Sequence, residues 1–443
     1  MNYRDAYKKI LNANIDRSER EYDELIQKLE ARAGNVPDRT LLRFKRAQEL
    51  LHVGTFPVIN VVGTNGKGTI AKAIYDASTA FGIDTALYIS PHLINYNERI
   101  RSSKDNKSNF ISNYHLFELI KLIDELECEI APKYGSFTYF EVISLAASIY
   151  FQNLYNEGDI KFVILEAGVG GRFDTTKEIG YSLMSVIASI SIDHKSYLGD
   201  NIADIAWHKA GIIAANSVVL TLNQNEAYDE IKKETVKKGA KLFGPSDLRI
   251  SSEKEDGSFI LKFNNNFIKL NPIQKGPFRR ENYSLAAAAM TIILEMTGIK
   301  IDVNKLEEAL NKSYWEGRME LLKKDPITIL DGAHNEDAVT KLYDSFKDRS
   351  IISVVAYMNT KEHAKMAGFI NRRSKNVIVT TNGDHKSVEL DELKRETGAS
   401  KAFSSPIDAI NYAREIALKD DIILISGSLY LVGIVLANRD TIK

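Results

Sequence analysis

Short apolar runs alternate with longer amphipathic segments along most of this 443-residue chain. After a first stretch of about 50 residues that is expected to be helical, with a turn at 38–40, continuous apolar runs predict strands at 57–63, 84–90, 161–168 and 184–190. Such runs are typical of strands covered on both faces, and the segments between them are long enough for crossover helices. The pattern therefore predicts a parallel, doubly wound sheet of the α/β class.

The pattern changes between about residues 241 and 270, where short alternating segments are separated by Asp-Gly and Asn-rich turns. These segments, 248–251, 258–263 and 267–270, predict a small antiparallel meander. An Ala-rich helix follows at 281–296, and a second α/β pattern has its strands at 327–330, 351–356, 376–380 and 422–426. We expect a P-loop domain over 1–312, a linker at 313–320 and a smaller Rossmann-like domain over 321–443.

Composition excludes several classes of protein. With 44% hydrophobic and 26% charged residues and a net charge of −1, nothing favours binding to nucleic acid or to an anionic membrane. The longest apolar stretch, 422–437, is interrupted by Gly427, Ser428 and Gly433, so no membrane span is expected. The N-terminus is polar and shows no signal peptide, which favours the cytoplasm. The single cysteine, Cys128, lies between two glutamates and is not expected to act as a nucleophile.

One glycine-rich turn indicates a nucleotide site. Residues 58–69 read VINVVGTNGKGT, an apolar run followed by a turn and then by a helix-compatible segment. Backbone N–H groups of such a loop and the positive end of the helix dipole bind phosphate oxygens. Lys67 would reach the outer phosphates, and Gly63, Gly66 and Gly68 would allow close approach of the backbone.

The turn departs from the standard phosphate loop at two positions. That motif has a Ser or Thr directly after its lysine to bind magnesium, whereas Gly68 stands there and the hydroxyl comes at Thr69. Val61 occupies the place of the first glycine. Either this site binds its metal differently, or the string is a fortuitous glycine turn.

Polar side chains follow three further predicted strands. These are Ser90, in a Ser-Pro-His string, Glu166, which leads into a Gly-Gly-Arg turn, and His194, which follows Asp193. Ligands of open parallel sheets bind at the carboxyl ends of the strands, so these groups are expected to meet the phosphate loop. A buried carboxylate needs a partner, and a metal ion is a natural one for Glu166.

Simpler interpretations remain open for each group. Ser90 could merely begin a turn, and His194 could be a solvated loop histidine. Arg172 suits an anion, although arginine is common on surfaces. Lys209, before a helix-capping Gly211, would by spacing alone be a surface lysine.

Together these strings resemble the folylpolyglutamate synthase and dihydrofolate synthase family of the Mur ligase superfamily. The motifs occur in the family's order as GTNGKGT, SPHL with NERI, TYFE, LEAGVGGRFD, DH before LG, IAWHKAGI, WEGRME, DGAHN and GSLYLVG. The resemblance covers about residues 41–433. It implies an ATP-dependent amide ligase in which ATP phosphorylates a carboxylate of a folate-type substrate and the amino group of L-glutamate attacks the acyl phosphate.

The resemblance also implies roles for the site residues. A first magnesium ion would be held by Ser90 and Glu166, and a second by Glu166 and His194. Lys209 matches a lysine that is carbamylated in related enzymes, which would make it a further metal ligand. The residues expected at ATP are Gly63, Thr64, Asn65, Gly66, Lys67, Gly68, Thr69, Asn282, Arg318, Asp331 and His334. Lys67, Lys209, His194 and Arg318 are expected to be catalytic.

Departures from the family pattern leave the substrate open. Lys177, His208 and Glu316 replace the usual Asn, Glu and Pro, and an Asp-Lys-Asp string is present only as Thr360-Lys361-Glu362. Extension of the γ-glutamate tail of tetrahydrofolate is the expected reaction, with dihydropteroate as a second substrate, and the loops at 96–101 and 138–141 would decide between them. The alternatives are a cell-wall Mur ligase and a non-catalytic nucleotide-binding relative. A monomer is expected.

Overall fold

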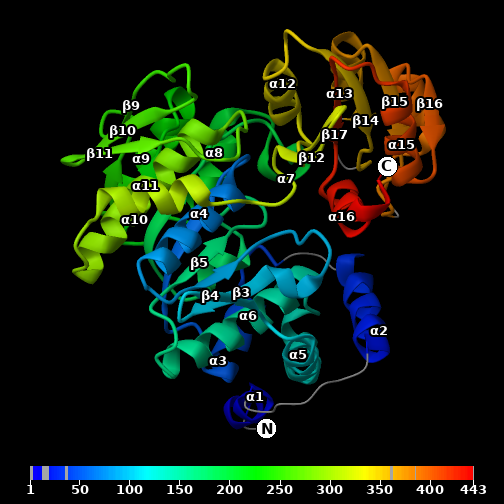
Figure 1. The fold of residues 1–443 in the computed structure, drawn as a ribbon. Coiled ribbons are helices and arrows are strands. Elements are labelled where there is room, and N and C mark those ends of the chain that lie inside the picture. The colour runs from blue at the N-terminus through cyan, green and yellow to red at the C-terminus, as the bar shows by residue number, and fades with distance from the viewer. Residues whose placement is uncertain (1–2, 12–18, 35–37, 360–362, 385, 443) are drawn as a thin grey trace.

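The first half of the chain is built on a large sheet. The computed structural model describes all residues except 1–2, 12–18, 35–37, 360–362, 385 and 443. Within the described residues the sheet has eight strands in the order β4-β3-β2-β5-β1-β6-β7-β8. Figure 1 labels β3, β4 and β5 of this sheet. Their bounds are β1 Pro57–Val62, β2 Ala86–Tyr88, β3 Ile100–Lys104, β4 Lys107–Phe110, β5 Val163–Glu166, β6 Tyr181–Ile187, β7 Val218–Thr221 and β8 Lys241–Phe243. The pairs β2–β3 and β3–β4 are antiparallel, and all other neighbouring strands are parallel. The predicted, mostly parallel sheet is thereby confirmed.

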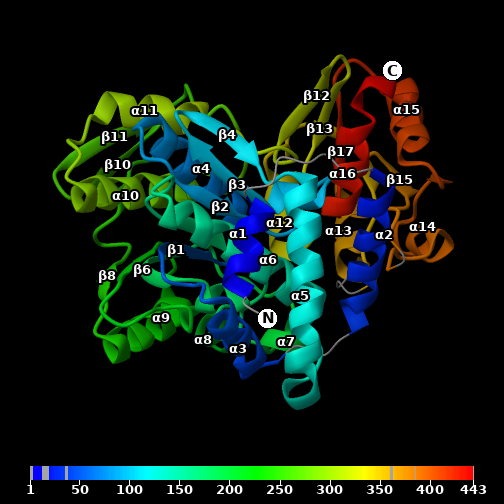
Figure 2. The same cartoon turned by 90° about the horizontal axis from the view of Figure 1, so that it is seen from below.

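Helices cover both faces of this sheet. They are α1 Tyr3–Leu11, α2 Glu19–Glu30, α3 Leu42–Leu51, α4 Lys67–Ala80, α5 Asn113–Tyr134, α6 Tyr139–Asn156, α7 Lys195–Leu198, α8 Ile202–Ala210 and α9 Asn225–Lys238. One core joins α3, α5 and α6 to the sheet, and a second joins α4 to its other face (Figure 2). Burial on both sides explains why the central strands are continuously apolar.

The hairpin of β3 and the edge strand β4 was not predicted. Their sequence is polar, and all four residues of β4 are exposed. Asp105 and Asn106 join them with φ values of 52° and 63°, the left-handed pair that a tight hairpin requires. A polar edge hairpin carries no apolar signal, so the hydrophobic pattern could not reveal it.

The predicted meander and the Ala-rich helix are present. The meander consists of β9 Arg249–Ile250, β10 Phe259–Phe263 and β11 Asn266–Leu270. It packs with α10 Arg279–Thr297 and α11 Val303–Lys312 in the same core as α4. Asn282, in the first turns of α10, is thereby brought against the start of α4.

A second sheet forms the C-terminal part. Its strands, in the order β12-β13-β17-β14-β15-β16, are parallel except for β12 against β13. The strands are β12 Glu320–Lys324, β13 Ile327–Leu330, β14 Ser350–Val355, β15 Asn376–Thr380, β16 Lys401–Phe403 and β17 Asp421–Ser426. The helices are α12 Glu336–Asp344, α13 His363–Arg373, α14 Leu390–Thr397, α15 Pro406–Ile416 and α16 Leu429–Ala437. Apart from the antiparallel β12, this is the Rossmann-like arrangement expected.

The two parts meet at the carboxyl ends of their strands. The carbonyl oxygen of Leu93, in the loop after β2, lies against the backbone of Gly433 in α16, where no side chain would fit. The turn after β13 lies near the phosphate loop, because Asn335 at the start of α12 is hydrogen-bonded to Asn65. In the described part of the chain, none of the helices combines the length and apolar character needed to span a bilayer.

Candidate active site

The glycine-rich turn after β1 has the geometry of a phosphate loop. Helix α4 begins at Lys67, and Gly66 caps it with φ 91°, a value that favours glycine. A side chain on Gly66 would lie 2.2 Å from Oδ1 of Asn282, so the loop also packs tightly against α10. Nζ of Lys67 donates to the carbonyl oxygens of Gly63 and Thr64 at 3.2 and 3.3 Å. The loop therefore presents a helix N-terminus and a lysine at one point.

Tertiary packing leaves little room for a side chain at position 68. A Cβ at this position would lie 2.9 Å from Nε1 of Trp315 and 3.4 Å from Oε2 of Glu166. The place of the usual hydroxyl-bearing side chain is thus taken by a tryptophan that follows α11 and by the carboxylate from the neighbouring strand. The departure from the standard loop has a physical cause and is not a sign of a fortuitous turn.

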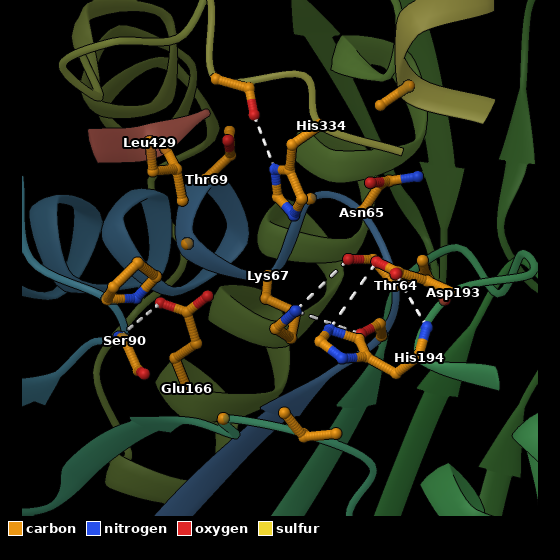
Figure 3. A pocket seen from close by; sticks show the side chains of 18 of the residues that line it. Thr64, Asn65, Lys67, Thr69, Ser90, Glu166, Asp193, His194, His334 and Leu429 are labelled. Atoms are coloured by element: carbon orange, nitrogen blue, oxygen red, sulfur yellow. Dashed lines mark hydrogen bonds and ion pairs between the residues drawn. The ribbon is translucent and has the colours of Figure 1, made fainter. Parts of the chain in front are cut away.

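Glu166 and Ser90 lie together beside this loop. The sheet register pairs Glu166 with Val61, and the backbone N–H of Ser90 donates to Oε2 of Glu166 at 3.2 Å. Glu166 is only 6% exposed. Burial raises the pKa of its carboxyl group, and the charge of Lys67 opposes that shift. Figure 3 shows Ser90 and Glu166 on one side of Lys67, and Asp193 and His194 on the other.

His194 and Lys209 come from the elements after β6. His194 has φ 50° and a side chain that is 42% exposed, and its Nε2 lies 3.8 Å from Oδ2 of Asp193. Lys209 is 3% exposed, and its Nζ donates to the carbonyl oxygen of Gly63 at 2.8 Å. The interpretation of Lys209 as a surface lysine is therefore wrong: α8 directs its side chain to the base of the phosphate loop.

A buried arginine, Arg99, was not singled out from the sequence. It is 2% exposed, and its guanidinium donates to Nδ1 of His92 at 2.9 Å, to the hydroxyl of Tyr139 at 2.7 Å and to Oγ of Ser90 at 3.3 Å. All three acceptors are neutral groups. This buried cation therefore fixes the side chains of Ser90, His92 and Tyr139.

The C-terminal part adds polar groups to the same place. Burial raises the pKa of Asp331, and the nearby Arg318 opposes that shift. Both carboxylate oxygens of Asp331 accept backbone N–H groups, from Met319 and Ala333, each at 2.8 Å. Nδ1 of His334 lies 2.7 Å from the carbonyl oxygen of Gly332. Asp331 and His334 follow β13, the first parallel strand of the second sheet, whereas Arg318 lies just before β12.

A cavity of about 710 Å³ joins these groups. The predicted site residues all line it: Gly63, Thr64, Asn65, Gly66, Lys67, Gly68, Thr69, Ser90, Glu166, His194, Lys209, Asn282, Arg318, Asp331 and His334. The aromatic residues Tyr139, Phe140, Phe173 and Tyr430 also line it. The size suits a nucleotide beside a second, partly aromatic substrate.

Other residues considered from the sequence lie outside the cavity lining. Arg172 donates to Glu234 at 2.8 Å and lies 3.9 Å from the ring centroid of Trp207, which is a structural role. Lys177 and His208 also do not line the cavity. Thr360-Lys361-Glu362 falls outside the described residues.

The fold and this cavity define a class: a two-sheet, phosphate-loop ligase of the Mur type. Residues 317–429 match the family described as "Mur ligase, glutamate ligase domain". The chain is 30% identical to the dihydrofolate synthase/folylpolyglutamate synthase of Bacillus subtilis over 390 residues, 84% of this chain and 88% of that protein. It is 26% identical to the enzyme of the same name from Escherichia coli, over 85% of each chain.

Solved structures of enzymes from this family have the same fold as this chain. The E. coli FolC protein in complex with DHPP and ADP superimposes with a TM-score of 0.81 at 25% identity, covering 95% of this chain and 97% of that one. A Mycobacterium tuberculosis folylpolyglutamate synthase complexed with ADP has the same fold, with a TM-score of 0.82 at 23% identity over 95% and 98% of the chains. The chain belongs to the dihydrofolate synthase/folylpolyglutamate synthase family of ATP-dependent ligases.

Proposed function

We propose that this enzyme uses ATP to activate a carboxylate of a folate-type substrate and joins it to the amino group of L-glutamate. The observation that supports this most directly is the meeting of three charged groups in one cavity, Lys67, Glu166 and Arg318. Ser90, which also lines the cavity, is hydrogen-bonded to the buried Arg99. Two anions, a triphosphate and a carboxylate, must be brought together, and cations aimed at the charge of the transferring phosphoryl group supply most of the catalysis.

In this proposal the phosphate loop and Lys67 hold the triphosphate of ATP, and Arg318 reaches the phosphates from the C-terminal side. Asn282, Asp331 and His334 contact the remainder of the nucleotide. Arg99, which does not line the cavity and donates to Oγ of Ser90 at 3.3 Å, would hold Ser90 in position. Because these residues come from both parts of the chain, closure would exclude water and protect the acyl phosphate from hydrolysis.

The donor set beside the loop fits magnesium. Glu166 offers a buried carboxylate whose charged form is costly without a cation, and Ser90 offers a hydroxyl. His194 follows the next strand, and Lys209 would become an oxygen ligand if carbamylated, with its Nζ already at the base of the loop. Bound magnesium would neutralise phosphate charge.

The proposed substrates are tetrahydrofolate bearing one or more glutamates and, as a second activity, dihydropteroate. The dual names of the B. subtilis and E. coli relatives and the DHPP bound to the E. coli structure support both. Tyr139, Phe140 and Phe173 offer aromatic faces along the cavity on which a pterin ring could stack.

The wider organisation is part of the same proposal. We propose a nucleotide-binding domain over 1–312, a linker at 313–320 and a glutamate-ligase domain over 321–443, which agrees with the match at 317–429. A monomer in the cytoplasm is proposed as well, and a single cysteine in 443 residues is consistent with a reducing compartment. Size-exclusion chromatography with light scattering tests the monomer.

The experiment is a phosphate-release assay with ATP, magnesium and L-glutamate. Dihydropteroate, tetrahydrofolate monoglutamate or a UDP-muramoyl precursor is added separately, and the products are identified by mass. Lys67→Ala is expected to abolish activity, whereas Lys72→Ala, which removes a lysine paired with Asp76 on the same helix, should retain it. Phosphate release that needs no folate, or that needs the UDP-linked precursor, would refute the proposal.

A further inference from the structure

The side chain of Asn65 in the phosphate loop is engaged by the C-terminal part of the chain. Its Nδ2 donates to Oδ2 of Asp337 at 3.0 Å and to Oδ1 of Asn335 at 3.4 Å. Its Oδ1 accepts from Nδ2 of Asn335 at 3.0 Å. Two amides that are 270 positions apart thus form a reciprocal pair, and Asp337 lies beside it.

Asn335 connects three elements of the cavity. Its Oδ1 caps α12 by accepting the N–H of Ala338 at 2.9 Å, and its Nδ2 also donates to Oδ2 of Asp193 at 3.2 Å. Asp193 directly precedes His194, and Asn65 lies two positions before Lys67. One side chain therefore ties the start of α12 to the phosphate loop and to the histidine loop.

Both amides of this pair are buried. Asn65 is 9% and Asn335 5% exposed. A buried amide that loses its partner bears the full cost of desolvation, so the pair favours one arrangement of the two parts over intermediate ones. The backbone of the phosphate loop is held on its strand side, for example by Thr64 N to Ser189 O at 2.7 Å, so the side chain of Asn65 is the part of the loop that meets α12.

We propose that Asn65 and Asn335 are positioning residues that couple nucleotide binding to the placement of glutamate. Phosphates seated on the loop fix Asn65, Asn65 and Asp193 then dock the start of α12, and the glutamate-ligase part is aligned with the acyl phosphate. This inference rests on the proposed function. A broken pair should weaken glutamate use more than ATP binding, because the phosphates keep their contacts with the loop and Lys67, whereas the placement of glutamate depends on the docked α12.

The test uses variants that leave the helix cap in place. Asn335→Ser keeps an oxygen for the N–H of Ala338 and removes the donor to Asn65 and Asp193. Asp337→Ala removes the second acceptor of Asn65. Glu336→Ala is the matched control, because it removes a charge from the same first turn of α12 at an exposed position. Melting temperatures confirm that each variant folds.

Two measurements are made on the full chain with its substrates. For Asn335→Ser the KM for glutamate should rise about tenfold, as expected for the loss of two hydrogen bonds, with the KM for ATP changed less. Asn65→Ala, which lies in the phosphate loop itself, should raise the KM for both substrates. The double variant should have a KM for glutamate little above that of either single one, because both break the same contact. Glu336→Ala should behave as wild type.

The second measurement, small-angle X-ray scattering with AMPPNP and magnesium, needs no ligation. The wild-type protein should become more compact, and Asn335→Ser and Asp337→Ala should do so less. If these variants became as compact as the wild-type protein and had its KM for glutamate, the coupling would be refuted, although the wild-type protein would still be a ligase. A wild-type protein without ligase activity would refute the proposed function, and the scattering comparison would still decide the coupling.

Discussion

Replacing Gly433 by alanine should stabilise a helix and yet impair the enzyme. Gly433 is the fifth residue of α16, and alanine in a helix interior is favoured over glycine by about 1 kcal/mol. A Cβ there would lie 1.9 Å from the carbonyl oxygen of Leu93, whereas ordinary contact begins at 3.4 Å. The loop after β2, which carries Ser90, must therefore move by about 1.5 Å relative to α16.

The expected consequence is a large loss of activity. A misplacement of about 1 Å at a reacting centre can cost 100-fold in rate, so kcat/KM for glutamate should fall by about that factor. Nucleotide binding should change much less, because the phosphate loop is not displaced directly.

Steady-state kinetics and thermal unfolding check this prediction together. Gly368→Ala in α13 is the matched control, because a Cβ there meets only Nη1 of Arg372, at 3.6 Å. It should raise stability slightly and leave kcat/KM unchanged. If Gly433→Ala retained wild-type kcat/KM, the contact between Leu93 and Gly433 would not belong to the active arrangement, and the reasoning would be wrong.

Three further predictions concern the site. Gly68→Ser should raise the KM for ATP about tenfold by displacing Trp315, and Trp315→Leu in the same chain should reduce that effect in a phosphate-release assay. Burial, together with the charge of Arg99, lowers the pKa of His92 to about 3. The free energy of unfolding is therefore full above the unfolded pKa of about 6.5 and falls as the pH drops towards 3, by at most about 1.4 kcal/mol per pH unit. Urea unfolding at several pH values should show a weaker dependence of that free energy on pH for His92→Asn. Lys209→Ala should be inactive and partly rescued by acetate if a carbamate acts there, and full activity without rescue would exclude that role.

Much of the site was readable because its motifs are local. The loop at 63–69 and the strand ends at Ser90 and Glu166 follow apolar runs, and a parallel sheet places such ends on one edge. The family resemblance then predicted that Asn282 and His334 belong to the same site, and both line the cavity. Their chemical roles stay predictions.

Residues that act through distant contacts gave no such signal. Arg99 belongs to the NERI string, but only the fold shows that its guanidinium is buried among neutral acceptors. Lys209 appeared to be a surface residue by spacing, and α8 turns it inward to Gly63. A pattern of apolar positions reports which face of an element is buried, and it does not report which polar groups meet there.

The sequence by itself determined the α/β class, the positions of the central strands along the chain, the phosphate loop and the family, because each of these depends on local periodicity or on contiguous motifs. Only the tertiary structure decided why Gly68 must be a glycine and how Asn65 meets Asn335. The contacts of Gly68 with Trp315 and of Asn65 with Asn335 join residues more than two hundred positions apart. Their geometry is set by how distant elements pack against one another, and that is a property of the whole folded chain.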